Sequence, residues 1–172
     1  MTACAETGRS ERIELIVDGL LRSGSLRLRL RGLSMLPSLW PGDEVEFAVC
    51  GAEELQRGEV VLAVRDERIF VHRVVKVGES GYVITRGDAM PGSDAAFPAQ
   101  AVVGKAIRVL RGGRSFPVSQ QVTLLRRMFG LLLCYSSLVR RVGLRVYGLC
   151  VEDQQNLPTQ NAASRVSAVV RD

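Results

Sequence analysis

The stretch that decides the fold runs from Glu59 to Arg86 and reads EVVLAVRDERIFVHRVVKVGESGYVITR. It holds three runs rich in Val, Ile and Phe, at 59–65, 68–77 and 81–86. Short polar turns separate the runs and favour antiparallel pairing, because a parallel crossover needs a dozen or more residues. Similar strand-like runs occur outside this stretch, at 26–31, 44–50 and 101–110. We therefore expect a mainly β protein, with a compact antiparallel, barrel-like β-domain over residues 25–115.

A helix is predicted ahead of the β-domain, in the unit formed by residues 1–24. Ser10 can cap a helix that spans 10–24, and Gly24 can end it. An apolar stripe follows at helical spacing. Its members are Ile13, Ile16, Val17, Leu20 and Leu21.

The sequence becomes basic and apolar after the β-domain. Residues 95–151 contain no Asp or Glu. The basic residues in this stretch are Lys105, Arg108, Arg111, Arg114, Arg126, Arg127, Arg140, Arg141 and Arg145. Residues 119–149 have apolar side chains at helical spacing, so we expect a basic, apolar helical segment over 116–151.

Three interpretations of residues 119–149 remain open. The segment can be a helix or helical hairpin packed on the β-domain or on a partner. It can also be an interfacial helix in peripheral contact with an anionic membrane. Nucleic-acid binding is the third, and it is disfavoured because leucines dilute the basic residues and no known binding motif is present.

Composition excludes several classes of protein. Of 172 residues, 47% are hydrophobic and 24% are charged, which argues against a disordered chain or a collagen-like repeat. The apolar run 128–139 would span about 18 Å as a helix, short of a hydrocarbon core of about 30 Å. The first ten residues lack the apolar core of a signal peptide. We expect a cytoplasmic protein with a flexible polar tail over 152–172.

The sequence predicts neither a metal site nor an organic cofactor. The chain has a single His, and its cysteines form no Cys-x-x-Cys pair, so a zinc finger is disfavoured and reduced thiols are expected. The cysteines are Cys4, Cys50, Cys134 and Cys150.

Four residues supply the groups of a nucleophilic active site. Ser34 lies just past a strand-like run, His72 lies inside one, and Asp88 and Asp94 follow another. A Ser hydroxyl needs a positioned base to become a nucleophile, and an acid can orient that base. Lys76 is a rival base on the same strand face, about 13 Å from His72 at roughly 3.3 Å per residue. One Ser cannot use both.

Four segments also resemble those of a known family. They are Ser34-Met35-Leu36-Pro37, Gly42-Asp43-Glu44-Val45, His72-Arg73-Val74 and Gly87-Asp88. In this order they resemble signal peptidase I and its relatives, a superfamily that includes the self-cleaving repressors of the SOS response and of phages. The resemblance covers residues 30–110 and implies the β-fold of that superfamily.

The resemblance also implies roles for individual residues. Ser34 would be the nucleophile, and its backbone N–H would stabilise the oxyanion. His72 stands where most members have Lys, as in the endoplasmic-reticulum and archaeal signal peptidases, and would be the general base. Asp88 and Asp94 match the two acidic positions, and the resemblance leaves open which one contacts the imidazole. The sequence departs from signal peptidases in having no apolar anchor before Ser34, and from the repressors in having no helix-turn-helix there.

We therefore expect a serine endopeptidase that cleaves a peptide or protein substrate through an acyl-enzyme. The alternative is a catalytically inactive module on the same fold that binds a peptide or a partner.

Overall fold

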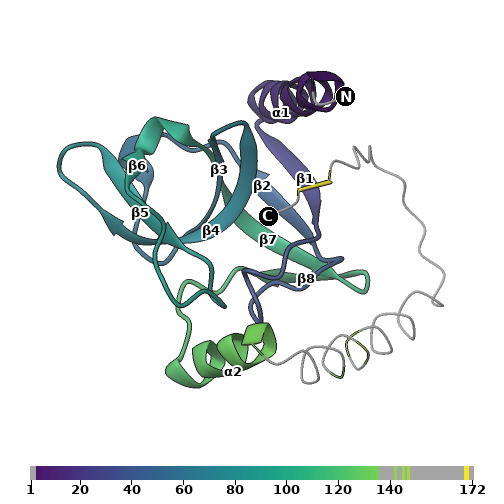
Figure 1. Ribbon diagram of the computed structural model, residues 1–172, viewed down its shortest axis with the longest axis vertical. Helices are drawn as coiled ribbons and strands as arrows, with labels where there is room; N and C mark the ends of the chain where they lie inside the picture. The colour runs from purple at the N-terminus through teal and green to yellow at the C-terminus, as the bar shows by residue number, and fades with distance from the viewer. Residues whose placement is uncertain (1–2, 136–141, 143–144, 146, 148–168, 171–172) are drawn as a thin grey trace.

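The computed structural model describes residues 3–135, 142, 145, 147 and 169–170 (Figure 1). An N-terminal helix, α1, precedes the sheet, and a second helix, α2, follows it on the opposite side of the molecule (Figure 1). The helices span α1 Ala3–Ser23 and α2 Leu124–Tyr135. The strands are β1 Ser25–Leu30, β2 Glu44–Ala48, β3 Val60–Arg65, β4 Arg68–Val77, β5 Tyr82–Arg86, β6 Phe97–Pro98, β7 Val102–Arg111, β8 Arg114–Pro117 and β9 Val169–Val170.

The strands form one sheet in the order β6-β5-β4-β3-β7-β2-β1-β9, and β8 pairs with β7 beside this path. All the pairings are antiparallel except that of β1 with the short β9. The prediction of a mainly β fold is confirmed. The sheet curls (Figure 1), but it is not a closed barrel, because in the described residues β6 and β9 end the strand order without pairing with each other.

Each predicted strand is present to within two residues, and three additional strands were not predicted. β8 was missed because all four of its residues are exposed, so it has no buried apolar alternation. It follows Gly112 and Gly113, whose positive φ angles of 53° and 75° make the tight turn from β7. β6 and β9 have two residues each, and β9 lies within the predicted polar tail.

The N-terminal helix begins at Ala3, seven residues before the predicted cap. Ser10 therefore lies inside α1, because the preceding residues continue the helix. Ile16 and Leu20 are buried as predicted, whereas Leu21 is exposed. Gly24, with φ of +72°, ends the helix and turns the chain into β1.

Strand β3 lies at the centre of the core. Its first four residues are all buried, and they alternate between two hydrophobic clusters on the two faces of the sheet. Val60 and Leu62 join the cluster that α1 covers with Leu20, while Val61 and Ala63 join the other. This double burial explains why β3 reads as a continuous apolar run.

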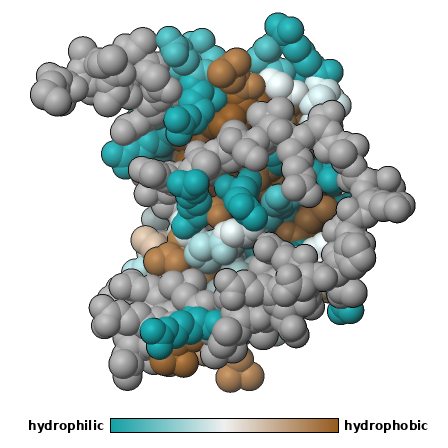
Figure 2. All heavy atoms as spheres, turned by 90° about the vertical axis from the view of Figure 1, so that its right-hand side faces the viewer, coloured by the Kyte–Doolittle hydropathy of each residue, from teal (hydrophilic) through white to brown (hydrophobic). Residues whose placement is uncertain are grey.

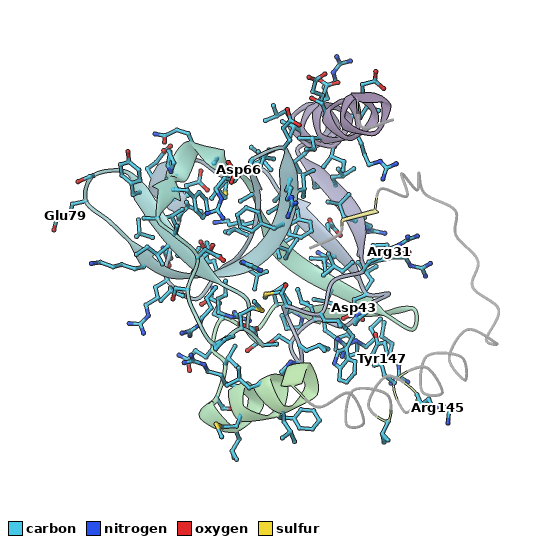
Figure 3. The ribbon with its side chains drawn as sticks, viewed as in Figure 1. Arg31, Asp43, Asp66, Glu79, Arg145 and Tyr147 are labelled. Carbon is cyan, nitrogen blue, oxygen red and sulfur yellow. The ribbon has the colours of Figure 1, made fainter. Side chains whose placement is uncertain are left out.

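A buried carboxylate, Asp43, fixes the turn between β1 and β2. Arg111 at the end of β7 donates to both of its oxygens, at 2.8 and 2.6 Å, and the Trp40 N–H donates at 2.8 Å. The Tyr147 hydroxyl also donates to Asp43, and its ring stacks on Trp40 at 4.6 Å between centroids (Figure 3). Burial, followed by the hydrogen bond to Asp43, raises the pKa of Tyr147.

We predict that Asp43→Ala lowers the free energy of unfolding by about 3 kcal/mol, because it leaves the Arg111 guanidinium without its buried partner. Urea denaturation measures the change. Glu79→Ala is the matched control, since Glu79 is exposed on the hairpin turn between β4 and β5 and its loss should cost no more than about 0.5 kcal/mol (Figure 3). Equal losses in the two variants would contradict the stabilising role of Asp43.

Candidate functional site

The centre of the candidate site is a hydrogen bond between His72 on β4 and Asp94 on the loop after β5. His72 Nδ1 lies 2.7 Å from Asp94 Oδ2, and both side chains are largely shielded, with 12% and 21% of their surfaces exposed. The rings of Phe70 and His72 pack edge to face, with 5.2 Å between their centroids. When Nδ1 carries the ring proton, its N–H donates a hydrogen bond to Asp94, and Nε2 is the nitrogen that can accept a proton.

Thr85 holds Asp94 in place from the neighbouring strand. The fully buried Thr85 hydroxyl donates to Asp94 Oδ2 at 2.5 Å, and the Asp94 N–H donates to the Thr85 carbonyl at 2.8 Å. Thr85 pairs with Val74 across β4 and β5, which places it on the same sheet face as His72. Both the backbone and the side chain of Asp94 are therefore held in place.

The pKa of Asp94 is lowered. Burial acts in the opposite direction, but the hydrogen bonds from His72 and Thr85 and the positive charges of His72 and Arg65 outweigh it. Arg65 also donates to the Ala95 carbonyl at 3.3 Å, so its charge is held beside this loop. Asp94 is accordingly ionised at neutral pH, as an acid that orients an imidazole must be.

Asp88, the other predicted acid, binds Arg73 instead of His72. The two side chains form a buried bidentate pair, with both N···O distances at 2.8 Å. Arg73 also donates to the backbone carbonyls of Gly58 and Ser119, at 2.7 and 2.6 Å. Of the two acids whose roles the sequence left open, Asp94 contacts the imidazole and Asp88 anchors the loop that begins at Gly87.

Ser34 lies against this same loop. Its carbonyl accepts a hydrogen bond from the Ala89 N–H at 2.8 Å, and Leu36 and Ala89 pack together in a small buried cluster. A Cβ atom added at Gly87 would lie 2.7 Å from the carbonyl oxygen of Ser34 and 2.9 Å from the Cβ atom of Ser34. Only glycine permits this approach, so the motif glycine has a steric role.

The strand register brings His72 to the same place. Arg73 pairs with Arg86, so the antiparallel register continued by one residue sets Gly87 beside His72. Ser34 contacts Gly87 directly. The structure thus gathers Ser34, His72 and Asp94 around the end of β5.

The rival base is excluded from this cluster. The β4–β5 register shifts between Val74 and Lys76, which breaks the alternation that would have kept Lys76 on the face of His72. Lys76 is exposed.

Cys50 is also unsuited to be a nucleophile. It is a free, buried thiol, and burial is the main cause that raises its pKa to about 11. Its sulfur therefore stays protonated at neutral pH, and a protonated thiol attacks poorly.

Arg73 also lines a cavity of about 190 Å³. The hydroxyl of Ser38, which lines it, is buried and has no hydrogen-bond partner among the described residues. Phe116, Val118 and Arg111 also contribute to its wall, whereas Ser34, His72 and Asp94 do not. The cavity is therefore separate from the candidate catalytic groups.

Sequence reasoning missed two supporting residues of the site. Thr85 gave no signal, because a Thr inside a strand is expected on β-propensity alone. Arg73 was noted only as part of a motif. A signal for its role was available, since an Arg with apolar neighbours on a predicted central strand needs a buried carboxylate.

No protein-family model, no curated protein and no solved structure matches this chain.

The lowered pKa of Asp94 predicts a pH dependence of stability. Its folded pKa lies below the unfolded value of about 3.9, so its contribution is present above about pH 4 and is lost as pH falls through the folded pKa. In urea denaturation, the difference in unfolding free energy between the wild type and Asp94→Asn should shrink as the pH is lowered from about 5 to 2.

Thr85→Val provides the matched variant for this test. It removes one of the hydrogen bonds that lower the pKa of Asp94, so the acid-dependent loss of unfolding free energy should be smaller than in the wild type and should level off at a higher pH. An Asp94→Asn difference that stays constant over this acid range would show that the carboxylate is not stabilised as described.

Proposed function

We propose that this protein is a serine endopeptidase of the signal peptidase I-like superfamily. Ser34 is the nucleophile, His72 the general base, and Asp94 the acid that orients the imidazole. The observation that best supports the proposal is the 2.7 Å contact between His72 Nδ1 and Asp94 Oδ2 beside the loop that contacts Ser34. Because this contact occupies Nδ1, the second ring nitrogen, Nε2, is available for proton transfer.

The reaction would proceed through an acyl-enzyme. The Ser34 oxygen attacks the carbonyl carbon of the scissile bond while His72 Nε2 takes the hydroxyl proton. The C–N bond then breaks, and the imidazolium gives its proton to the leaving amine. A water molecule, deprotonated by the same nitrogen, then attacks the ester carbonyl. The C–O bond to Ser34 breaks, the imidazolium returns its proton to the Ser34 oxygen, and the acid product is released. Asp94 stabilises the imidazolium in both halves of the reaction without taking up its proton.

Asp88 and Arg73 have a positioning role in this proposal. Their buried pair fixes the loop that begins at Gly87, and that loop contacts Ser34. Because a small misplacement of a reacting group costs a large factor in rate, a rigid loop favours catalysis. Asp88 acts through this loop and does not touch the imidazole.

The first test is cleavage of a diverse peptide pool by the purified chain, read by mass spectrometry. The wild type should produce discrete cuts. Ser34→Ala and His72→Ala should each reduce the cutting rate by about 10³-fold or more, because either change removes the acylation chemistry. Circular dichroism verifies that both variants remain folded.

Lys76→Ala is the matched control and should cut at the wild-type rate, since Lys76 is exposed. Cuts that persist unchanged in Ser34→Ala would refute the proposal. Peptide binding without cleavage, equal in the wild type and Ser34→Ala, would favour the inactive binding module instead.

Gly87→Ala tests the contact between Ser34 and the loop. The new methyl group would overlap the Ser34 backbone, so it should slow peptide cleavage by about 10²-fold through displacement of the nucleophile. Gly92→Ala in the same loop is the control, because a Cβ there meets nothing within 4 Å. Equal activity in the two variants would mean that the contact does not position Ser34.

A further inference from the structure

The helix α2 has one side docked on the β-domain. A Cβ added at Gly130 would lie 2.5 Å from the carbonyl oxygen of Leu36 and 3.1 Å from Pro37 Cδ. Gly130 is itself buried, so the helix backbone rests directly on the segment that follows Ser34. This close contact fixes which side of α2 faces away from the protein.

The outward side of α2 is apolar. Leu125, Met128, Phe129 and Leu132 are exposed to 84%, 66%, 45% and 52%. Their spacing of three, four and seven residues puts them on one helix face, where a surface helix in water would carry polar groups. Hydrophobic side chains project from the lower edge of the molecule, at the level of α2 (Figure 2). Such a group of large apolar side chains marks an interaction site.

The charge around this face is positive. Burial is the main cause that lowers the pKa of Arg86, at the end of β5. The positive charge of Arg127 on α2 lies close enough to lower this pKa further. Arg145, farther along the chain, is exposed (Figure 3). No Asp or Glu occurs between residues 95 and 151. An anionic surface would complement these charges, whereas a second copy of the chain would add like charges opposite them.

We propose that α2 docks in the plane of an anionic lipid bilayer, with the side chains of Leu125, Met128, Phe129 and Leu132 at the boundary of the acyl chains. In this position Arg127 and Arg145 lie at the level of the lipid phosphates. The helix has twelve residues, and among the described residues no helix is long and apolar enough to cross a membrane. The proposed contact is peripheral, because the Gly130 side of α2 stays docked on the β-domain. It does not depend on the peptidase proposal.

The test is flotation of the full chain with lipid vesicles at low and high salt. The wild type should bind vesicles of phosphatidylcholine mixed with phosphatidylglycerol, and bind pure phosphatidylcholine or high-salt samples at least about tenfold more weakly. The double variant Leu125→Ser/Leu132→Ser should lose at least about tenfold in binding to the anionic vesicles. Ser34→Ala should bind like the wild type, which separates this result from the catalytic test.

The matched control is Leu15→Ser/Leu21→Ser, which removes two exposed leucines from α1 at the other end of the molecule and should bind like the wild type (Figure 1). Thermal unfolding should be equal in the two double variants, because all four leucines are exposed. Three results would overturn the proposal: no binding of the wild type to anionic vesicles, equal binding of the α2 variant, or a dimer in light scattering that the α2 variant abolishes.

Discussion

The guanidinium of Arg73 is the constraint on which the site depends. From the middle of the sheet it binds both oxygens of Asp88 and the carbonyls of Gly58 and Ser119, so it joins four segments of the chain. A buried charge tolerates little displacement, because moving it from its partners leaves it unsolvated. Gly87, next to Asp88, therefore has a fixed position, and Ser34 lies against it. The candidate nucleophile is placed by an ion pair that takes no part in the chemistry.

Adjacent residues on β4 serve different faces of the sheet. His72 points to the side of Thr85 and Asp94, while Arg73 points to the side of Asp88 and Gly58. Because side chains alternate along a strand, a slip of one residue in the β4–β5 register would exchange the imidazole and the guanidinium. The short turn at Gly81 and the bulge after Val74 help to fix that register.

The sequence was informative where a local pattern determines structure. Alternating apolar residues and short turns predicted β1 to β5 and β7. The order of the four sequence motifs identified Ser34 and His72 as candidate site residues. It could not distinguish Asp88 from Asp94, because that choice depends on the path of a loop whose residues are mostly small or polar. Nor could it orient α2, since the glycine that docks the helix, Gly130, carries no hydrophobic signal. The apolar stripe was visible, but its outward direction depends on tertiary contact.

The environment of Asp43 has a consequence for the order in which the chain can fold. Its partner Arg111 lies 68 residues later, and Tyr147 lies 104 residues later. A chain emerging from the ribosome would form the β1–β2 hairpin early, yet its turn carboxylate would still need water. The carboxylate can be enclosed only after β7 has been made, and fully only after Tyr147 has arrived. Completion of this corner is thus a late event in synthesis, controlled by contacts of long sequence separation.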